Sequence, residues 1–267
     1  MTKSFDLHAG NSEFYIDPVY YDYEFKSRTE DVKFYADEYL KNDGPTLELA
    51  IGSGRIALKA VAQGADVVGV DLAPAMVDRA QQHFDRLRGR RKGTLELHTG
   101  DMREIRLDRT FGLVTCPFNA FQHMYTAADA ERCLETAKAH LAPGGTFILD
   151  ILMPDFEYLL RSPHKAVPGV RFRHPTYQEY YTYSERSDYD PVTQVNQMWF
   201  HYERCNQDGN GPSEITIQLS HRYFYPQEIM SLLRYNGIRV KECYGDFQRG
   251  PLDSTSDSMV LVCELAT

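Results

Sequence analysis

One stretch, Thr46–Met76, constrains the fold of this chain more than any other. It begins with an apolar segment of the strand type, which runs into a turn containing two glycines. A helical pattern of apolar residues follows and is closed by Gly64, and a second apolar segment ends in Asp71. A β-α-β unit of roughly 30 residues has the length that a parallel crossover needs. The sequence therefore predicts an α/β fold with a mostly parallel sheet.

The turn in this stretch has the features of a nucleoside-binding loop. Gly52 and Gly54 let backbone N–H groups approach a ligand at the positive end of the following helix. Asp71 follows Gly52 by 19 positions (71 − 52) and is expected at the tip of the second strand, where a carboxylate can accept from both hydroxyls of a ribose. Residues 52–57 also match the dinucleotide fingerprint G-x-G-x-x-G/A, which on its own leaves the ligand open.

Periodicity and turn residues predict the remaining elements. Strands of the main sheet are expected at 46–51, 66–71, 94–99, 111–116, 146–152, 238–244 and 258–264. Helices are expected at 24–41, 56–62, 74–87, 127–140 and 226–235. A tyrosine-rich antiparallel addition is expected to form three strands, at 170–186, 192–206 and 213–224, with one turn at 188–191. The chain is divided accordingly into a lid segment, a core, an antiparallel β insertion and a completion of the core sheet, at 1–40, 41–153, 154–224 and 225–267.

Composition excludes several classes of function. The net charge of −9 over 267 residues argues against a nucleic-acid partner, because phosphate binding relies on basic patches. No apolar run is long enough to cross a membrane, and residues 1–10 lack the apolar core of a leader. The five cysteines are scattered, which favours a reduced, cytoplasmic chain over a disulfide framework. No histidine pair has the spacing of metal ligands, so no metal is expected.

Three further motifs give the glycine turn a more specific meaning. Glu48 lies just before the turn, Gly100-Asp101-Met102 follows the third strand, and a Pro-Gly-Gly turn at 143–145 precedes the fifth. Together with the order of elements over 46–152 and a closing strand pair at 238–264, the chain resembles the class I S-adenosylmethionine-dependent methyltransferases. The resemblance implies a doubly wound, mostly parallel, seven-stranded Rossmann-like sheet, with the antiparallel β insertion over the active site. Ala50 occupies the first glycine position of the family motif, and a backbone with negative φ is expected there.

The resemblance also implies a set of residues that bind S-adenosylmethionine, with S-adenosylhomocysteine as the product. Gly52 and Gly54 would approach the methionine part, Asp71 would bind the ribose hydroxyls, and Asp101 would accept from the adenine amino group. The implied cofactor-binding set is Glu48, Ala50, Gly52, Gly54, Arg55, Asp71, Leu72, Met76, Gly100, Asp101, Met102, Pro117 and Phe118.

Their expected places differ. Glu48 would act near the methionine part, Leu72 and Met76 would flank the adenine, and Met102 would pack on its ring. Pro117 and Phe118 would line the methionine end. Met76 has a simpler alternative as a core methionine on an apolar helix face.

Catalysis by methyl transfer needs a positioned acceptor and a group that removes its proton. His123 is the predicted base, because it follows the fourth strand at the edge where open α/β sheets bind ligands. The alternative is a capping or packed histidine. Small-molecule N-methyltransferases acting on amino sugars have a histidine in this loop and a Tyr-Asp pair near the N-terminus, which here is Tyr21-Asp22. Tyr21 and, behind it, Tyr15 are the predicted lid partners of His123.

The sequence thus predicts a cytoplasmic enzyme that transfers a methyl group to a small molecule, with an amine favoured over a hydroxyl as the acceptor. Two alternatives stay open: an NAD-dependent oxidoreductase, and a catalytically inactive nucleoside-binding subunit of the same fold. The β insertion could also serve as the contact of a homo-oligomer, because exposed aromatic strands seek partners. The acceptor, the atom that is methylated, the number of methyl groups and the oligomeric state are not determined by the sequence.

Overall fold

The computed structural model describes residues 5–206 and 208–266, and it divides them into two compact units. The first, here called the core unit, comprises Arg28–Pro154 and residues 224–266. The second, called the antiparallel unit, comprises residues 5–27 and Asp155–Tyr223. Parts of the predicted lid, insertion and final segment, namely residues 1–4, 207 and 267, lie outside the described residues. The four-segment division of the chain stays a prediction.

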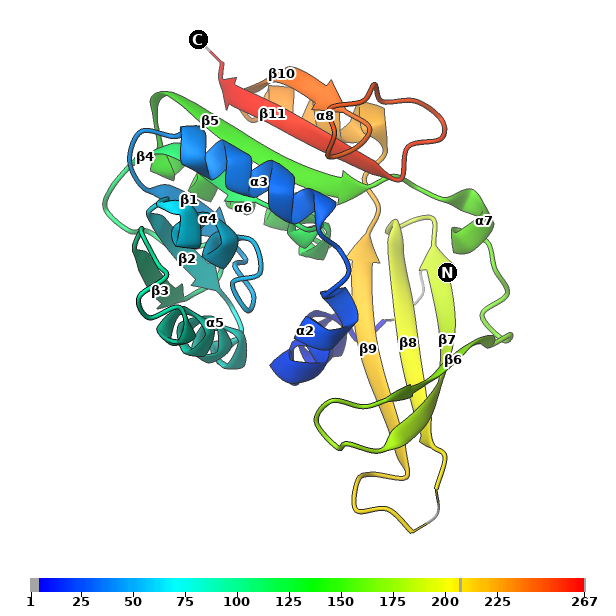
Figure 1. Ribbon diagram of the computed structural model, residues 1–267. Coiled ribbons are helices and arrows are strands. Elements are labelled where there is room, and N and C mark those ends of the chain that lie inside the picture. The colour runs from blue at the N-terminus through cyan, green and yellow to red at the C-terminus, as the bar shows by residue number, and fades with distance from the viewer. Residues whose placement is uncertain (1–4, 207, 267) are drawn as a thin grey trace. The chain divides into compact units, whose positions relative to one another are not determined.

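The core unit is built on a seven-stranded sheet in the order β10-β11-β5-β4-β1-β2-β3 (Figure 1). Strands β1 to β5 are parallel to one another, and β11 is antiparallel to both β5 and β10. The strands are β1 (Thr46–Leu49), β2 (Val67–Asp71), β3 (Leu95–Thr99), β4 (Phe111–Cys116), β5 (Leu141–Leu152), β10 (Ile238–Tyr244) and β11 (Ser258–Leu265). The predicted mostly parallel, seven-stranded sheet is confirmed.

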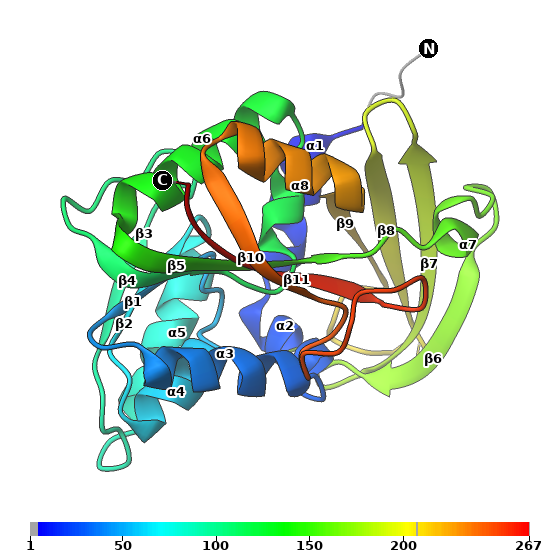
Figure 2. The same ribbon diagram turned by 90° about the horizontal axis from the view of Figure 1, so that it is seen from above.

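Helices cover both faces of this sheet (Figure 2). On one face, α3, α4 and α5 pack over Ile51, Ile148 and Val260, and on the other, α6 and α8 pack over Leu49, Leu149 and Leu261. The alternation of the buried side chains along β5 and β11 between two apolar layers is what a doubly wound sheet requires. The helical elements are α3 (Glu30–Lys41), α4 (Ala57–Gln63), α5 (Pro74–Arg86), η2 (Ala120–His123), α6 (Ala127–His140) and α8 (Pro226–Tyr235).

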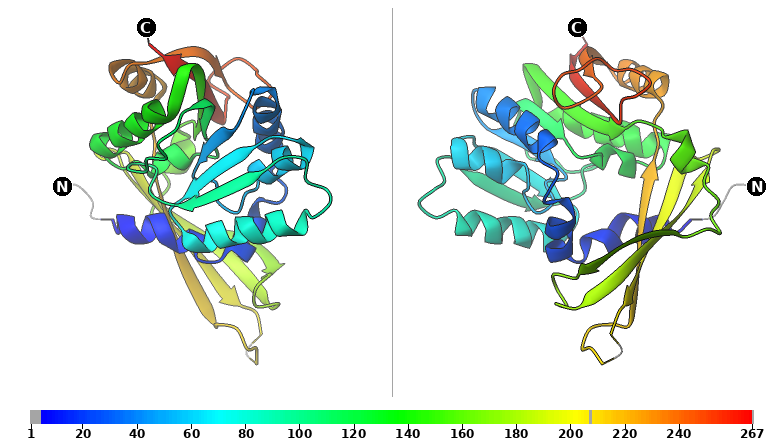
Figure 3. Two further views of the ribbon diagram at one scale, coloured as in Figure 1. Left: turned by 90° about the vertical axis from the view of Figure 1, so that its left-hand side faces the viewer. Right: turned by 45° about the vertical axis from the view of Figure 1, so that its right-hand side comes forward.

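The antiparallel unit contains a four-stranded sheet in the order β6-β7-β8-β9, whose long strands are seen in Figure 3. Tyr20, Tyr181 and Tyr202 form the buried centre of an aromatic cluster in this unit. Aromatic side chains of this kind bury large areas. The elements are α1 (Leu7–Ser12), η1 (Glu13–Tyr15), α2 (Pro18–Phe25), α7 (Phe156–Leu159), β6 (Val167–Arg173), β7 (Tyr180–Asp190), β8 (Val195–Arg204) and β9 (Glu214–Arg222).

Two predicted boundaries in this unit were wrong. The single strand expected at 170–186 is two strands, because the chain turns at 174–179, where Gln178 has a left-handed φ of 60° and its N–H donates to the His174 carbonyl at 2.8 Å. The turn expected at 188–191 lies at 191–194, after β7. There the Asp190 carboxylate accepts from Val192 N at 3.0 Å and closes the turn.

The single helix expected at 24–41 is also two helices, α2 and α3, and they belong to different units. Thr29 stands at the start of α3, and Glu30 and Asp31 supply the negative charge that the positive end of a helix favours. Phe34, Tyr35 and Tyr39 of α3 are buried in the core unit. In the part of the chain that the structure describes, no helix is both long and apolar enough to cross a bilayer.

Candidate cofactor and methyl-transfer site

The glycine turn after β1 is made by three residues with left-handed backbone angles: Ala50 (φ 58°), Gly52 (φ 58°) and Gly54 (φ 81°). The expected negative φ at Ala50 was therefore wrong, and β1 ends at Leu49 because the backbone turns there. A Cβ on Gly54 would lie 2.9 Å from the Leu58 side chain, so a larger residue would require that side chain to shift. The left-handed conformation thus favours glycine at 52 and 54, and at 54 the close Leu58 side chain favours it further.

Asp71, at the end of β2, holds this turn in place. Its Oδ2 accepts from Gly52 N at 2.7 Å, and its Oδ1 accepts from Ala73 N at 2.9 Å. Burial raises the pKa of this carboxyl, and the hydrogen bonds from the three backbone amides at 73, 52 and 72 oppose that rise. Three amide donors leave the carboxylate one of its about four acceptor sites, which a ribose hydroxyl can use. The predicted neighbourhood of the glycine turn and Asp71 is present in the structure.

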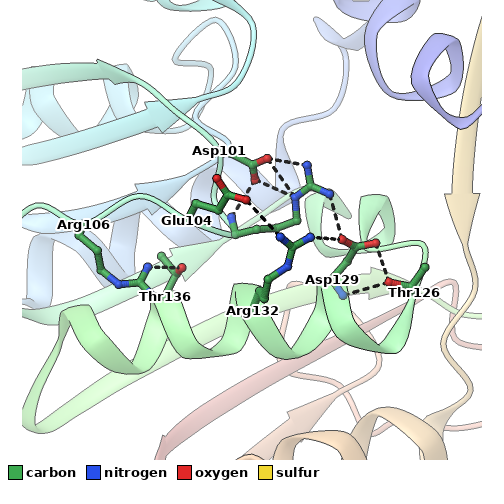
Figure 4. A network of polar contacts seen from close by, with 8 residues as sticks. Asp101, Glu104, Arg106, Thr126, Asp129, Arg132 and Thr136 are labelled. Carbon is green, nitrogen blue, oxygen red and sulfur yellow. Dashed lines mark hydrogen bonds and ion pairs between the residues drawn. The ribbon is translucent and has the colours of Figure 1, made fainter.

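Asp101 lies after β3 in a network of ion pairs that connects this loop to α6 (Figure 4). Arg103 donates to the Asp101 carboxylate from Nε at 3.0 Å and from Nη2 at 2.5 Å, and Arg103 Nη1 reaches Asp129 at 3.0 Å. Arg132 bridges Asp129 and Glu104. Burial alone would raise the pKa of Asp101, but the hydrogen bonds from Arg103 outweigh it and lower the pKa. The carboxylate is therefore ionised and fixed in orientation.

The residues beside these loops differ in exposure. Leu72 is half exposed at 50%, so its side chain is available to a ligand. Met102 is partly buried against the apolar core. The backbone at Gly100 lies close to the Ile105 side chain, since a Cβ at Gly100 would come within 2.6 Å of it. Met76 is fully buried, which supports its alternative role as a core residue and gives no support to a contact with adenine.

The Glu48 side chain is buried in the sheet and is not exposed at its edge. It is 1% exposed, and its Oε2 accepts from the Tyr39 hydroxyl at 2.8 Å. Burial raises the pKa of Glu48 to about 8. The predicted action of Glu48 near the methionine part of a cofactor stays a prediction.

The segment after β4 is held by a buried carboxylate that the sequence analysis did not single out. Phe118 N and Asn119 N donate to the two oxygens of Asp150 at 2.8 and 3.0 Å, and the Tyr35 hydroxyl donates to the same group at 2.6 Å. The Arg55 guanidinium lies over the Phe118 ring, 4.3 Å from its centroid, and Arg55 also pairs with Asp31 of α3. Arg55 thus connects the glycine turn with the segment after β4.

His123 ends the short helix η2 that follows this segment. Its ring is 8% exposed, and its Nδ1 is hydrogen bonded to the Tyr125 hydroxyl at 3.1 Å. Tyr15 and Tyr21 belong to the antiparallel unit, where their rings lie 6.0 Å apart and Tyr21 is 8% exposed. The pairing of His123 with these tyrosines stays a prediction.

Some buried polar atoms at this edge of the sheet have no hydrogen-bond partner among the described residues. They are Ser53 Oγ in the glycine turn and Asn119 Oδ1 after β4. Since buried polar groups are normally satisfied, such atoms call for a partner that is a water or a ligand. Within the described ranges, no group of three His, Cys, Asp or Glu side chains could hold a metal ion. The observed groups fit a cofactor that carries hydroxyl and amino groups.

A Rossmann-like sheet closed by an antiparallel strand pair, with a glycine turn bound by an acid after β2, defines a methyltransferase fold. Residues 46–145 match the family model described as "Methyltransferase domain". This stretch of the chain is therefore similar to a methyltransferase domain, and it lies within a methyltransferase fold. The NAD-dependent alternative is not favoured.

Curated relatives align with part of the chain. A dTDP-3-amino-3,6-dideoxy-alpha-D-glucopyranose N,N-dimethyltransferase of Streptomyces fradiae is 31% identical over 104 residues, which are 39% of this chain and 38% of that protein. A dTDP-4-amino-2,3,4,6-tetradeoxy-D-glucose N,N-dimethyltransferase of Saccharopolyspora spinosa is 31% identical over 104 residues, covering 39% of each chain. The aligned part thus spans about two-fifths of the length of these relatives.

Solved structures align over most of the chain and establish the fold. The CcbJ methyltransferase of Streptomyces caelestis aligns with a TM-score of 0.75 and 22% identity over 89% of this chain and 95% of that one. CalS10, described as an amino pentose methyltransferase from Micromonospora echinaspora with S-adenosylmethionine bound, aligns with a TM-score of 0.67 and 22% identity over 93% and 97%. The similarity therefore includes the antiparallel addition as well as the sheet.

Proposed function

We propose that this protein transfers methyl groups from S-adenosylmethionine to an amine of a small molecule, and that the amine is carried by a sugar. The observation that carries the proposal is the turn formed by Gly52 and Gly54 and fixed by Asp71, within a methyltransferase domain. The relatives named as amino-sugar N,N-dimethyltransferases support the class of acceptor. The net charge of −9 supports a small-molecule acceptor over a nucleic acid.

The binding roles follow from the positions of the side chains. Asp71 would accept from the ribose hydroxyls while it keeps the turn in place, and Asp101 would accept from the adenine amino group. Arg103 holds Asp101 ionised for this role. Leu72 would cover the adenine from the exposed side. The bound cofactor supplies the electrophilic methyl group, and the protein supplies position and surroundings.

His123 is the proposed base for the acceptor amine. A histidine suits this task because its charge changes near neutral pH, and the hydrogen bond between Nδ1 and Tyr125 fixes the orientation of the ring. Tyr21 and Tyr15 are proposed to hold the acceptor. We also propose a homo-oligomer formed through the antiparallel unit, supported by the exposed Val170 (75%) and Tyr180 (45%) on β6 and β7.

Mass spectrometry tests the proposed reaction directly. The protein is incubated with S-adenosylmethionine and a panel of amino sugars, their nucleotide-linked forms and matched hydroxyl sugars. We expect a mass increase of about 14 Da for each methyl group on an amine. His123→Ala should lower turnover by about 100-fold or more, as removal of a general base does, while binding of S-adenosylhomocysteine is kept. Cofactor binding without turnover on any acceptor would instead indicate an inactive subunit.

A further inference from the structure

A carboxylate in the antiparallel unit is held by two phenols. Glu185 lies on β7, and its two oxygens accept from the hydroxyls of Tyr158 and Tyr183, each at 2.7 Å. Tyr158 belongs to α7, which lies beside β7 in the same unit (Figure 1). A carboxylate has about four acceptor sites, so about two of them stay open for further donors.

The neighbouring cations do not neutralise Glu185. Arg204 of β8 pairs with Glu179 at 3.6 Å, and the guanidinium of Arg161 lies over the ring of Tyr158, 5.1 Å from its centroid. Among the residues that the structure describes, no lysine, arginine or histidine forms an ion pair with the Glu185 carboxylate. Because a half-buried charge is costly without a counter-ion, this position favours a cationic ligand.

Aromatic side chains surround this carboxylate. Phe200 lies directly across from Glu185 on β8, and the rings of Tyr183 and Phe200 are 6.1 Å apart. Burial raises the pKa of the Tyr158 and Tyr183 phenols, and the contact with Glu185 raises it further, so both phenols stay donors. An ammonium ion suits such surroundings, because its N–H groups donate to the carboxylate and its charge is attracted to ring faces.

A second polar group lies on the same face of this sheet. Asn196 of β8 is opposite Tyr189, and Tyr189 follows Glu185 on β7 by four positions (189 − 185), so the three side chains share one face. Asn196 is 0% exposed, and neither its Nδ2 nor its Oδ1 is hydrogen bonded to a described residue. Its amide can donate and accept, as a sugar hydroxyl can. Four residues of a strand span about 13 Å, which one sugar ring with a hydrogen bond at each end can bridge.

We propose that Glu185 binds the ammonium group of an amino sugar and that Asn196 binds a hydroxyl group of the same ligand. The inference deepens the proposed function and rests on it for the class of ligand, and it names the group that distinguishes an amine from a hydroxyl. An amine bound as ammonium must give its proton to a base before it attacks a methyl group, and His123 is proposed for that task. No bond forms or breaks at Glu185 or Asn196.

Isothermal titration in the absence of S-adenosylmethionine tests the role of the charge. The ligands are the amino sugars and matched hydroxyl sugars of the mass-spectrometry panel, free and nucleotide-linked. Wild type should bind at least one amino sugar about tenfold or more tightly than its hydroxyl match, since hydrogen bonds to charged groups are the strong ones. Glu185→Gln keeps the shape and removes the charge. It should bind this amino sugar at least about tenfold more weakly than wild type does, and the hydroxyl sugar within about twofold.

Two variants control for net charge and for folding. Glu203→Gln removes an exposed carboxylate of β8 on the opposite face of the sheet, and it should leave both affinities unchanged. Glu185→Asp keeps the charge and should keep the preference for the amine. Urea unfolding of each variant establishes that a loss of affinity is not a loss of the fold.

Asn196→Leu tests the other end of the site. It removes both polar atoms at similar volume, so the affinities for the amino sugar and its hydroxyl match should fall by the same factor, at least about fivefold. If Asn196 holds only a buried water, both affinities stay at their wild-type values and its part in the proposal is overturned.

The outcomes separate this inference from the proposed function. If wild type shows no preference for an amine, or if Glu185→Gln keeps that preference, the inference is overturned. Methylation of an amine in the mass-spectrometry experiment would then still support the proposed function. If Glu185→Gln loses the preference while no sugar of the panel is methylated by wild type, the proposed function fails and the ammonium site stands.

Discussion

The buried pair of Glu48 and Tyr39 predicts a pH-dependent stability with a definite sign. Burial raises the pKa of Glu48 from 4.5 to about 8, while the hydrogen bond from Tyr39 and the charge of Arg55 oppose the rise. Between these two values the unfolded chain is ionised at this position and the folded chain keeps its proton. The contribution of Glu48 to the free energy of unfolding is therefore fully present below pH 4.5, and it is lost as the pH rises to about 8.

The magnitude follows from the size of the shift. A rise of about 3.5 units at 1.36 kcal/mol per unit gives an upper limit of about 5 kcal/mol. Glu48→Gln has nearly the same shape and still accepts from Tyr39, but it cannot ionise. We expect the free energy of unfolding of Glu48→Gln to gain several kcal/mol relative to wild type between pH 5 and pH 9, because only in wild type does ionisation of the unfolded chain favour unfolding.

Urea unfolding of both proteins across this range measures the difference. Tyr39→Phe is the control: it removes a hydrogen bond that favours the ionised form, so the loss of stability should begin at the same pH and continue to a higher pH. A difference between wild type and Glu48→Gln that stays constant within about 0.5 kcal/mol from pH 5 to 9 would refute the reasoning.

Three further substitutions test other parts of the structure. Ala50→Gly should raise the free energy of unfolding by about 0.5 kcal/mol in urea titrations, because it relieves a left-handed alanine; a loss would show that φ is negative there. Tyr35→Phe should lower it by roughly 1–3 kcal/mol, since Asp150 loses a buried donor; an unchanged midpoint would contradict this. Arg103→Gln should raise the pKa of Asp101, so that binding of S-adenosylhomocysteine weakens progressively below pH 5. Titration calorimetry measures this binding. A pH profile of binding equal to that of wild type would count against the role of Arg103.

The parallel part of the fold could be predicted because its signals are local. Each strand of the main sheet is a short apolar run with its own turn, and Asp71 was predicted at the tip of the second strand, where the structure has it. Pro226 and Asn236 marked the ends of α8 in the same way. Local propensity and position along the chain were sufficient for these elements.

The features that were missed depend on contacts between residues far apart in the chain. Asp150 meets Tyr35 across 115 positions and Phe118 across 32, and no local pattern encodes such partners. A weaker signal was present, since a single carboxylate within the apolar strand 146–152 requires a buried donor. Arg103 was overlooked because an arginine two residues after an acid is common on surfaces.

The left-handed turn residues were missed for a related reason. Ala50 and Phe118 have ordinary side chains, and only the packing around them imposes a positive φ. Asn119 could have been recognised, because asparagine is among the residues enriched in that region.

Binding of S-adenosylhomocysteine tests the central claim most directly. Isothermal titration of wild type should show saturable binding of this ligand and none of NAD⁺, and Asp71→Ala should lose most of the affinity, because the ribose contact and the support of Gly52 disappear together. Equal affinity in wild type and Asp71→Ala, or binding of NAD⁺ in preference to S-adenosylhomocysteine, would contradict the account.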